Sequence, residues 1–206
     1  MARLVIPEPR AAYAQAAAWY VTLVSRVDGD WDAPALGVWT RRDLVGHTSR
    51  SMLTVESYLR DEPGQTEAAS AVDYFVRSRA ALANAEEVAE RGRAAGRALG
   101  DDPAGSVADI AARVLPLVAA AGLEAYVETP VADMRLDDYL PTRTVELAVH
   151  GCDLAVACGL EADLPTAVAA EAGAVLAALA AHGGTAADVL LAMTGRRGLP
   201  EGFTVL

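Results

Sequence analysis

The chain contains no lysine: all seventeen of its basic side chains are arginines. The missing lysine excludes Schiff-base chemistry and catalysis by a lysine nucleophile. Cysteine is almost as scarce, since only Cys152 and Cys158 occur. We predict that both lie on one helix, where a mutual disulfide is geometrically poor. The sequence therefore has no disulfide framework.

Positive charge is also in short supply, with 28 acidic residues against the 17 arginines and a formal net charge of −11. A surface for nucleic acid or for an anionic membrane needs a basic patch, so neither partner is expected. We find no apolar stretch that approaches the roughly 18 residues of a membrane span, and no signal peptide. These features lead us to expect a cytoplasmic protein.

Runs of β-branched residues are few, whereas alanine is abundant and hydrophobic residues make up 53% of the chain. This composition favours helices, and 206 residues are enough for one domain with a sizeable core. Thr40 with Asp43 forms an acidic variant of the capping box at one helix start, and Asp137 or Asp138 is the expected cap of another. Tyr126–Val127 is expected to be a short extended piece. The predicted helices cover about 9–27, 40–60, 71–99, 107–121, 138–158, 166–181 and 186–193.

These predictions give an all-α fold, a helical bundle with additional short helices. Its fifth helix contains the segment RTVELAVHGCD, in which Arg143, Glu146, His150 and Asp153 fall along one stripe. Most of the remaining surface of this helix is apolar, which indicates burial. Buried charges are costly unless a partner or a metal ion compensates them. A metal ion is one explanation of the stripe.

A second polar stripe carries His47 in the helix that begins after Thr40. Two histidines and one glutamate are a sufficient ligand set for a catalytic divalent metal, with positions left for water or substrate. The spacing alone leaves a structural Glu146–His150 pair open as an alternative. His182, the remaining histidine, is expected to end a helix, where its charge complements the helix dipole.

Two motifs carry a resemblance to a known family. VWTRRDLVGHTSRSM (38–52) and MRLDDYLPTRTVELAVHGCDLAVACGL (134–160) resemble segments of the mycothiol-dependent maleylpyruvate isomerase family, in the DinB-like superfamily. The tail LLAMTGRRG resembles the end of that family's N-terminal domain. The resemblance implies a DinB-like four-helix bundle and a single domain of this type over residues 1–206.

The resemblance also implies functional residues. His47, Glu146 and His150 would bind one divalent metal ion, usually zinc, and a low-molecular-weight thiol such as mycothiol would be the co-substrate. Asp153 matches the family's aspartate after the second histidine, and we assign it to orienting His150 or its neighbours. Arg143 matches the arginine before the glutamate. The implied activity is attack of a metal-activated thiol on a small electrophile, in transfer or in isomerisation.

Other residues are candidates for substrate binding. Arg50 and Arg143 are suited to hold a carboxylate, although Arg50 has a surface ion pair with Glu56 as an alternative, and Arg143 has a pair with Glu146. Tyr139 is a candidate hydrogen-bond donor, with packing as its alternative. Trp31 and Trp39 are expected to fold the first loop over the bundle.

Three further functions remain open on the sequence alone. The same ligand set suits a hydrolase or a non-haem iron enzyme, a binding or regulatory module could retain the bundle without the chemistry, and the bundle could hold no metal. The electrophile and the oligomeric state are also open, with a homodimer among the options.

Overall fold

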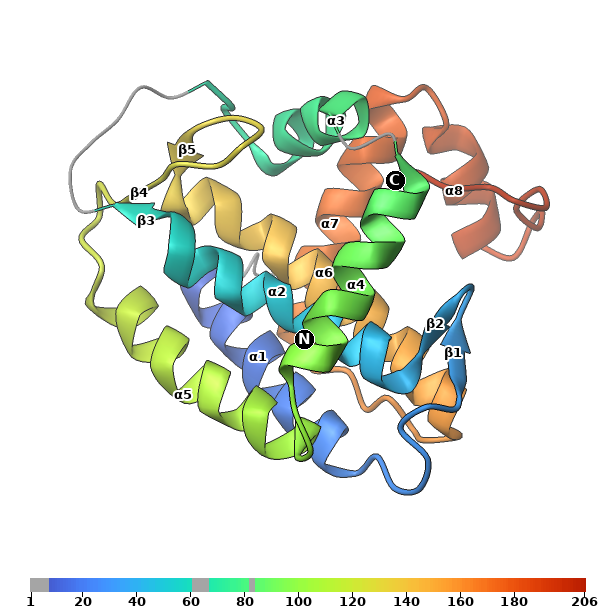
Figure 1. Cartoon of the computed structure of the whole chain (residues 1–206). Helices are drawn as coiled ribbons and strands as arrows, with labels where there is room; N and C mark the ends of the chain where they lie inside the picture. Colours follow the sequence, from blue (N-terminus) through green and yellow to red (C-terminus); the bar gives the residue numbers. More distant parts are fainter. Residues whose placement is uncertain (1–7, 61–66, 82–83) are drawn as a thin grey trace.

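Four helices form the central bundle of this computed structural model, which describes residues 8–60, 67–81 and 84–206. They are α1 (Pro9–Ser25), α2 (Arg41–Tyr58), α5 (Pro103–Ala120) and α6 (Leu136–Cys158). Helices α1 and α2 each contact both α5 and α6, which closes the ring of four (Figure 1). The all-α fold predicted from the sequence is confirmed.

Four further helices surround this bundle. α7 (Thr166–His182) packs on α6 and α1, α3 (Ala71–Ala81) on α6 and α7, α4 (Ala85–Ala98) on α2, and α8 (Ala186–Met193) on α7. In Figure 1, α4 crosses in front of α2. The outer helices therefore cover both central helices that carry the histidine motifs.

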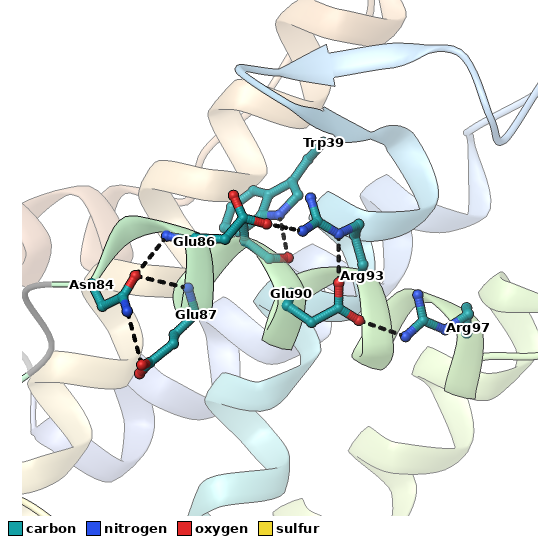
Figure 2. A network of polar contacts seen from close by, with 8 residues as sticks. Trp39, Asn84, Glu86, Glu87, Glu90, Arg93 and Arg97 are labelled. Atoms are coloured by element: carbon teal, nitrogen blue, oxygen red, sulfur yellow. Dashed lines mark hydrogen bonds and ion pairs between the residues drawn. The ribbon is translucent and has the colours of Figure 1, made fainter.

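The single helix expected over 71–99 is wrong, because α3 and α4 are separate helices. The Asn84 side chain accepts hydrogen bonds from the backbone N–H groups of Glu86 and Glu87, at 3.1 and 3.3 Å. A capping side chain of this kind starts a new helix in place of continuing the previous one. Figure 2 shows the cap together with the ion pairs along the outer face of α4.

Short strands fix the ends of the central helices. β1 (Pro34–Leu36) and β2 (Trp39–Thr40) form an antiparallel hairpin that leads directly into α2. A second, antiparallel sheet has the order β3 (Leu59–Arg60), β4 (Tyr126–Val127) and β5 (Met134–Arg135). The extended piece expected at Tyr126–Val127 is confirmed.

This second sheet sets the register between α2 and α6. β3 follows α2 directly and β5 precedes α6 directly, and both strands pair with β4. α2 therefore runs toward the sheet and α6 runs away from it, so the two helices lie side by side and antiparallel (Figure 1). His47 lies twelve residues before Leu59, and Glu146 lies eleven after Arg135. At about 1.5 Å per residue, their side chains stand at nearly the same height.

The predicted caps of α2 and α6 had different outcomes. At α2, the backbone N–H of Asp43 donates to the Thr40 hydroxyl (3.2 Å) and that of Thr40 donates to the Asp43 carboxylate (3.0 Å), so the capping box is confirmed. At α6, Asp137 and Asp138 lie inside the first turn and do not cap the helix, because β5 continues directly into it. Asp137 instead pairs with Arg10 of α1, at 2.7 Å.

Helix α5 corrects the expectation that no segment approaches the length of a membrane span. By length and composition, Pro103–Ala120 is apolar enough to cross a membrane, and a third of it is buried in the structure. The core helix of a soluble protein meets the same criteria. Here α5 packs on α1 and α2, and its Arg113 pairs with Glu56 of α2 at 3.2 Å.

Cys152 and Cys158 both lie on α6 as free thiols, so the expectation that they share one helix and form no mutual disulfide is confirmed.

Candidate metal centre

His47, Glu146 and His150 come together between α2 and α6. Nε2 of His150 lies 3.5 Å from Oε2 of Glu146, and Nε2 of His47 lies 4.0 Å from the same oxygen. The two imidazole rings meet edge to face, with 5.0 Å between their centroids. Two motifs about a hundred residues apart in sequence thus contribute to one cluster.

The donor set suits a divalent metal ion. One ligand atom from each of the three side chains lies within 4.8 Å of the other two. A tetrahedral zinc shell with bonds of about 2.1 Å places its ligand atoms about 3.4 Å apart. The two distances to Oε2 of Glu146, 3.5 and 4.0 Å, lie close to this value. Two imidazoles and one carboxylate also leave at least one position for a thiol or water.

Asp153 supports one member of this cluster. Its Oδ2 lies 3.1 Å from Nδ1 of His150, one turn along α6. Since Nε2 of the same ring faces Glu146, each nitrogen of His150 has a carboxylate beside it. A carboxylate on the second nitrogen fixes the orientation of a metal-binding histidine and makes it a stronger ligand.

The three side chains of the cluster differ in protonation state. Burial lowers the pKa of His47 to about 4, with a further contribution from the neighbouring His150. Burial would also lower the pKa of His150, but its hydrogen bonds with Asp153 and Glu146 outweigh this effect and raise the pKa to about 9. For Glu146, burial opposes ionisation, yet His150 and Arg143 lower the pKa to about 2. The cluster therefore combines an ionised carboxylate, a neutral His47 and a protonated His150, so a metal ion bound here would displace the proton from Nε2 of His150.

A cavity of about 470 Å³ opens beside the cluster and has His47 and Glu146 in its wall. Helices α2, α3, α4 and α6 all contribute to its lining. The polar and aromatic residues that matter below are Arg50, Thr54, Tyr74, Arg91, Tyr139 and Arg143. A small molecule in this cavity would lie next to the candidate ligands.

Arg50 and Arg143 both line this cavity. Among the described residues Arg50 makes no ion pair, and its expected alternative partner Glu56 is paired with Arg113 instead. No ion pair joins Arg143 to Glu146 in the described part of the chain either. The Arg143 guanidinium instead lies 4.8 Å from the centre of the Tyr139 ring, and its Nε donates to the Thr142 hydroxyl at 2.9 Å.

The remaining tyrosine candidate is engaged within the protein. Tyr139 is fully buried, and its hydroxyl donates to Oγ1 of Thr54 at 3.2 Å. Its ring forms an edge-to-face pair with Tyr74 of α3, which also contacts the Arg143 guanidinium at 5.7 Å. Tyr139 thus packs around the arginine as well as lining the cavity.

The sequence did not identify all the residues of this region. Trp39 was expected to fold a loop over the bundle, but its ring lies 4.4 Å from that of His47. Tyr74 and Arg91 were not predicted at all, because α3 and α4 carry no histidine or other distinctive motif. For Trp39 a signal existed, since it lies in the same motif as His47.

Two histidines and a glutamate from the central helices of an all-α bundle thus lie together beside one cavity. Residues 11–155 match a family model of the DinB-like superfamily, and the particular family is the mycothiol maleylpyruvate isomerase N-terminal domain. The chain therefore belongs to this family. The match extends from α1 into α6 and includes all three candidate ligands. No curated protein and no solved structure matches the chain.

Proposed function

We propose that this protein is a metal-dependent enzyme that uses a low-molecular-weight thiol, with mycothiol as the co-substrate and zinc as the metal. The observation that carries the proposal is the convergence of His47, Glu146 and His150 beside a cavity whose wall includes His47 and Glu146. The family contributes the link to mycothiol. In this proposal, a metal bound by these three residues supplies a Lewis acid that converts a thiol into its thiolate at neutral pH.

The chain's own residues would bind and orient the second substrate. Arg50 and Arg143 offer two guanidinium groups to a carboxylate or another anionic group in the cavity. The Tyr139 and Tyr74 rings hold Arg143 in place through cation–π contacts. Asp153 would keep the His150 ring oriented through its contact with Nδ1. We assign Arg143 to substrate contact and Asp153 to positioning.

Two reactions follow from a thiolate in this cavity. In isomerisation, its sulfur adds to a conjugated alkene, the former double bond rotates, and elimination of the same thiolate restores the alkene. The thiol is then unchanged overall. In transfer, the sulfur displaces a leaving group, and the thiol is consumed in equal amount to the product. The consumption of thiol therefore distinguishes the two reactions.

Metal binding is tested by elemental analysis of protein purified without a metal-affinity resin, followed by titration of the metal-free protein with Zn²⁺. We expect one metal ion per chain, with binding lost in His47→Ala and His150→Ala. His182→Ala is the matched control, because this histidine ends α7 outside the cluster. Equal Zn²⁺ affinity in all four proteins would contradict the proposal. Bound iron in place of zinc would indicate the oxygenase type of chemistry, since this ligand set also suits iron.

Thiol chemistry is tested with mycothiol and a panel of conjugated and alkylating electrophiles. We expect turnover that requires metal and stops in His150→Ala, with the loss of free thiol measured alongside product. A protein that holds metal but promotes neither reaction with any electrophile would instead be a binding module.

A further inference from the structure

The two histidines of the candidate metal centre are held in different ways. His150 has the usual arrangement, because its Nδ1 contacts the Asp153 carboxylate at 3.1 Å. His47 faces Glu146 with Nε2, whereas its buried Nδ1 has no hydrogen-bond partner in the part of the chain that the structure describes. The carboxylate or carbonyl that normally orients a metal-binding imidazole is therefore missing at His47.

An indole ring packs against the imidazole of His47 instead. Trp39 packs on His47 with 4.4 Å between the ring centroids and 33° between the ring planes. It also meets His150 edge-on, at 6.4 Å. Its side chain is only 9% exposed. The Trp39 ring thus covers one side of His47 and limits the rotation of its imidazole.

Contacts with the backbone of α4 fix the position of the indole itself. Its Nε1–H donates to the carbonyl of Ala89 at 3.0 Å, within the protein interior (Figure 2). Gly92, one turn further along α4, leaves space for the ring: a Cβ at this position would lie 2.6 Å from Cε2 and Nε1 of Trp39. The indole is consequently held between the backbone of α4 and the imidazole of His47.

We infer that Trp39 is the positioning residue of His47. Trp39 orients the His47 imidazole by stacking, whereas Asp153 orients the His150 imidazole by a hydrogen bond. The inference rests on the metal site proposed above. It also connects α4, which contributes Val88 and Arg91 to the cavity wall, with the metal centre. The position of α4 thereby influences the orientation of a metal ligand.

Three variants of the full-length protein test this role. Trp39→Phe retains an aromatic ring but loses the hydrogen bond to Ala89, Trp39→Leu loses both, and Gly92→Ala displaces the indole while leaving it in the sequence. Trp31→Leu is the matched control, because Trp31 lies in the loop before β1 and does not line the cavity. Melting temperatures and circular dichroism monitor folding in each case.

The main readout is titration of the metal-free proteins with Co²⁺, whose visible absorption reports both affinity and coordination geometry. Loss of an outer-shell partner costs about 10- to 100-fold in metal affinity, and we expect this loss for Trp39→Leu together with an altered spectrum. Trp39→Phe should show a smaller loss, because stacking is restored in part. Gly92→Ala should change the spectrum as well, and Trp31→Leu should match the unmodified protein.

Unchanged Co²⁺ affinity and spectrum in Trp39→Leu would overturn the inference, even if its melting temperature falls. If that variant does not fold, Trp39→Phe and Gly92→Ala decide the question by the same criterion. The same titrations also distinguish a failure of the proposed metal site from a failure of the proposed role of Trp39. Should the unmodified protein bind Co²⁺ no better than His47→Ala, both proposals are wrong. Should only the tryptophan and glycine variants behave like the unmodified protein, the metal site stands without this inference.

Discussion

At the scale of single residues, His150 is flanked by a carboxylate at each ring nitrogen, so its orientation depends on both Glu146 and Asp153. Replacing Asp153 by Asn keeps the shape of the side chain but removes the negative charge that favours one tautomer of His150. We expect Asp153→Asn to bind Zn²⁺ about 10- to 100-fold more weakly, without loss of the bound stoichiometry at saturation. Isothermal titration calorimetry measures both quantities. Asp109→Asn, an exposed position on α5, serves as the control.

The proposed role of Arg143 in binding an anionic group of the substrate can also be tested. Its guanidinium is held between the rings of Tyr139 and Tyr74 and lines the cavity. A hydrogen bond to a charged group contributes about 1.5–3 kcal/mol. We therefore expect Arg143→Met to lower kcat/KM by about 10- to 100-fold for a carboxylate-bearing electrophile, and far less for a neutral analogue of the same reactivity. An equal loss for both electrophiles would show that Arg143 does not recognise the anionic group.

At the scale of elements, the close contact between α2 and α4 depends on glycine residues in both helices. A Cβ added at Gly46 would lie 2.2 Å from the backbone nitrogen of Gly96, so the two helices approach each other by their backbones. Alanine is preferred over glycine in a helix by about 1 kcal/mol, but here overpacking should outweigh that preference. We expect Gly46→Ala to lower the free energy of unfolding by about 1–3 kcal/mol.

Gly173 provides the matched control for this prediction. It lies inside α7, and a Cβ there would meet no atom within 4 Å. Gly173→Ala should therefore raise the free energy of unfolding, by up to about 1 kcal/mol. Urea denaturation of both variants measures the two effects. A stabilised Gly46→Ala protein would show that α2 and α4 separate easily.

The elements also show what could be predicted from the sequence. The period of the stripe on α6 and the capping box of α2 are local signals, and the polar face of α6 and the start of α2 followed from them. The bundle followed from the composition and the predicted helices. The break between α3 and α4 did not, because Asn84 is compatible with a helix interior as well as with a cap. The contact of Trp39 with α4 depends on how two helices pack, which no local pattern contains. The same applies to Tyr74, which reaches Arg143 from a separate helix.

At the scale of the whole molecule, acidic residues outnumber arginines by eleven, yet the cavity is lined by three arginines and one glutamate. The excess of negative charge therefore lies outside the cavity. Many of the arginines outside the cavity form surface ion pairs, such as those of Arg93 with Glu86 and Glu90 on α4 (Figure 2). The molecule thus combines an acidic exterior with a local positive region suited to an anionic substrate.

One buried carboxyl group should make the stability of the whole fold depend on pH. Glu171 of α7 is only 4% exposed, and its Oε2 has no hydrogen-bond partner among the described residues. Burial raises the pKa of Glu171 from its ordinary value of 4.5 to about 7, although a hydrogen bond with Thr144 opposes this rise. The Thr144 hydroxyl already donates to the carbonyl of Leu140 at 3.2 Å.

Because the pKa is raised on folding, the neutral carboxyl group favours the folded state fully below about pH 4.5, and this contribution is lost as the pH rises through about 7. We expect Glu171 to lower the free energy of unfolding by up to about 1.4 kcal/mol per pH unit across this interval, or about 3 kcal/mol in total. The difference between the unmodified protein and Glu171→Gln, measured by urea denaturation from pH 4.5 to 8, isolates this contribution from other titrating groups. The exposed Glu161→Gln variant should leave the pH profile unchanged. Parallel profiles for the unmodified protein and Glu171→Gln would mean that the carboxylate is solvated in the folded protein, and that α7 packs less closely on α6 at this point than the structure indicates.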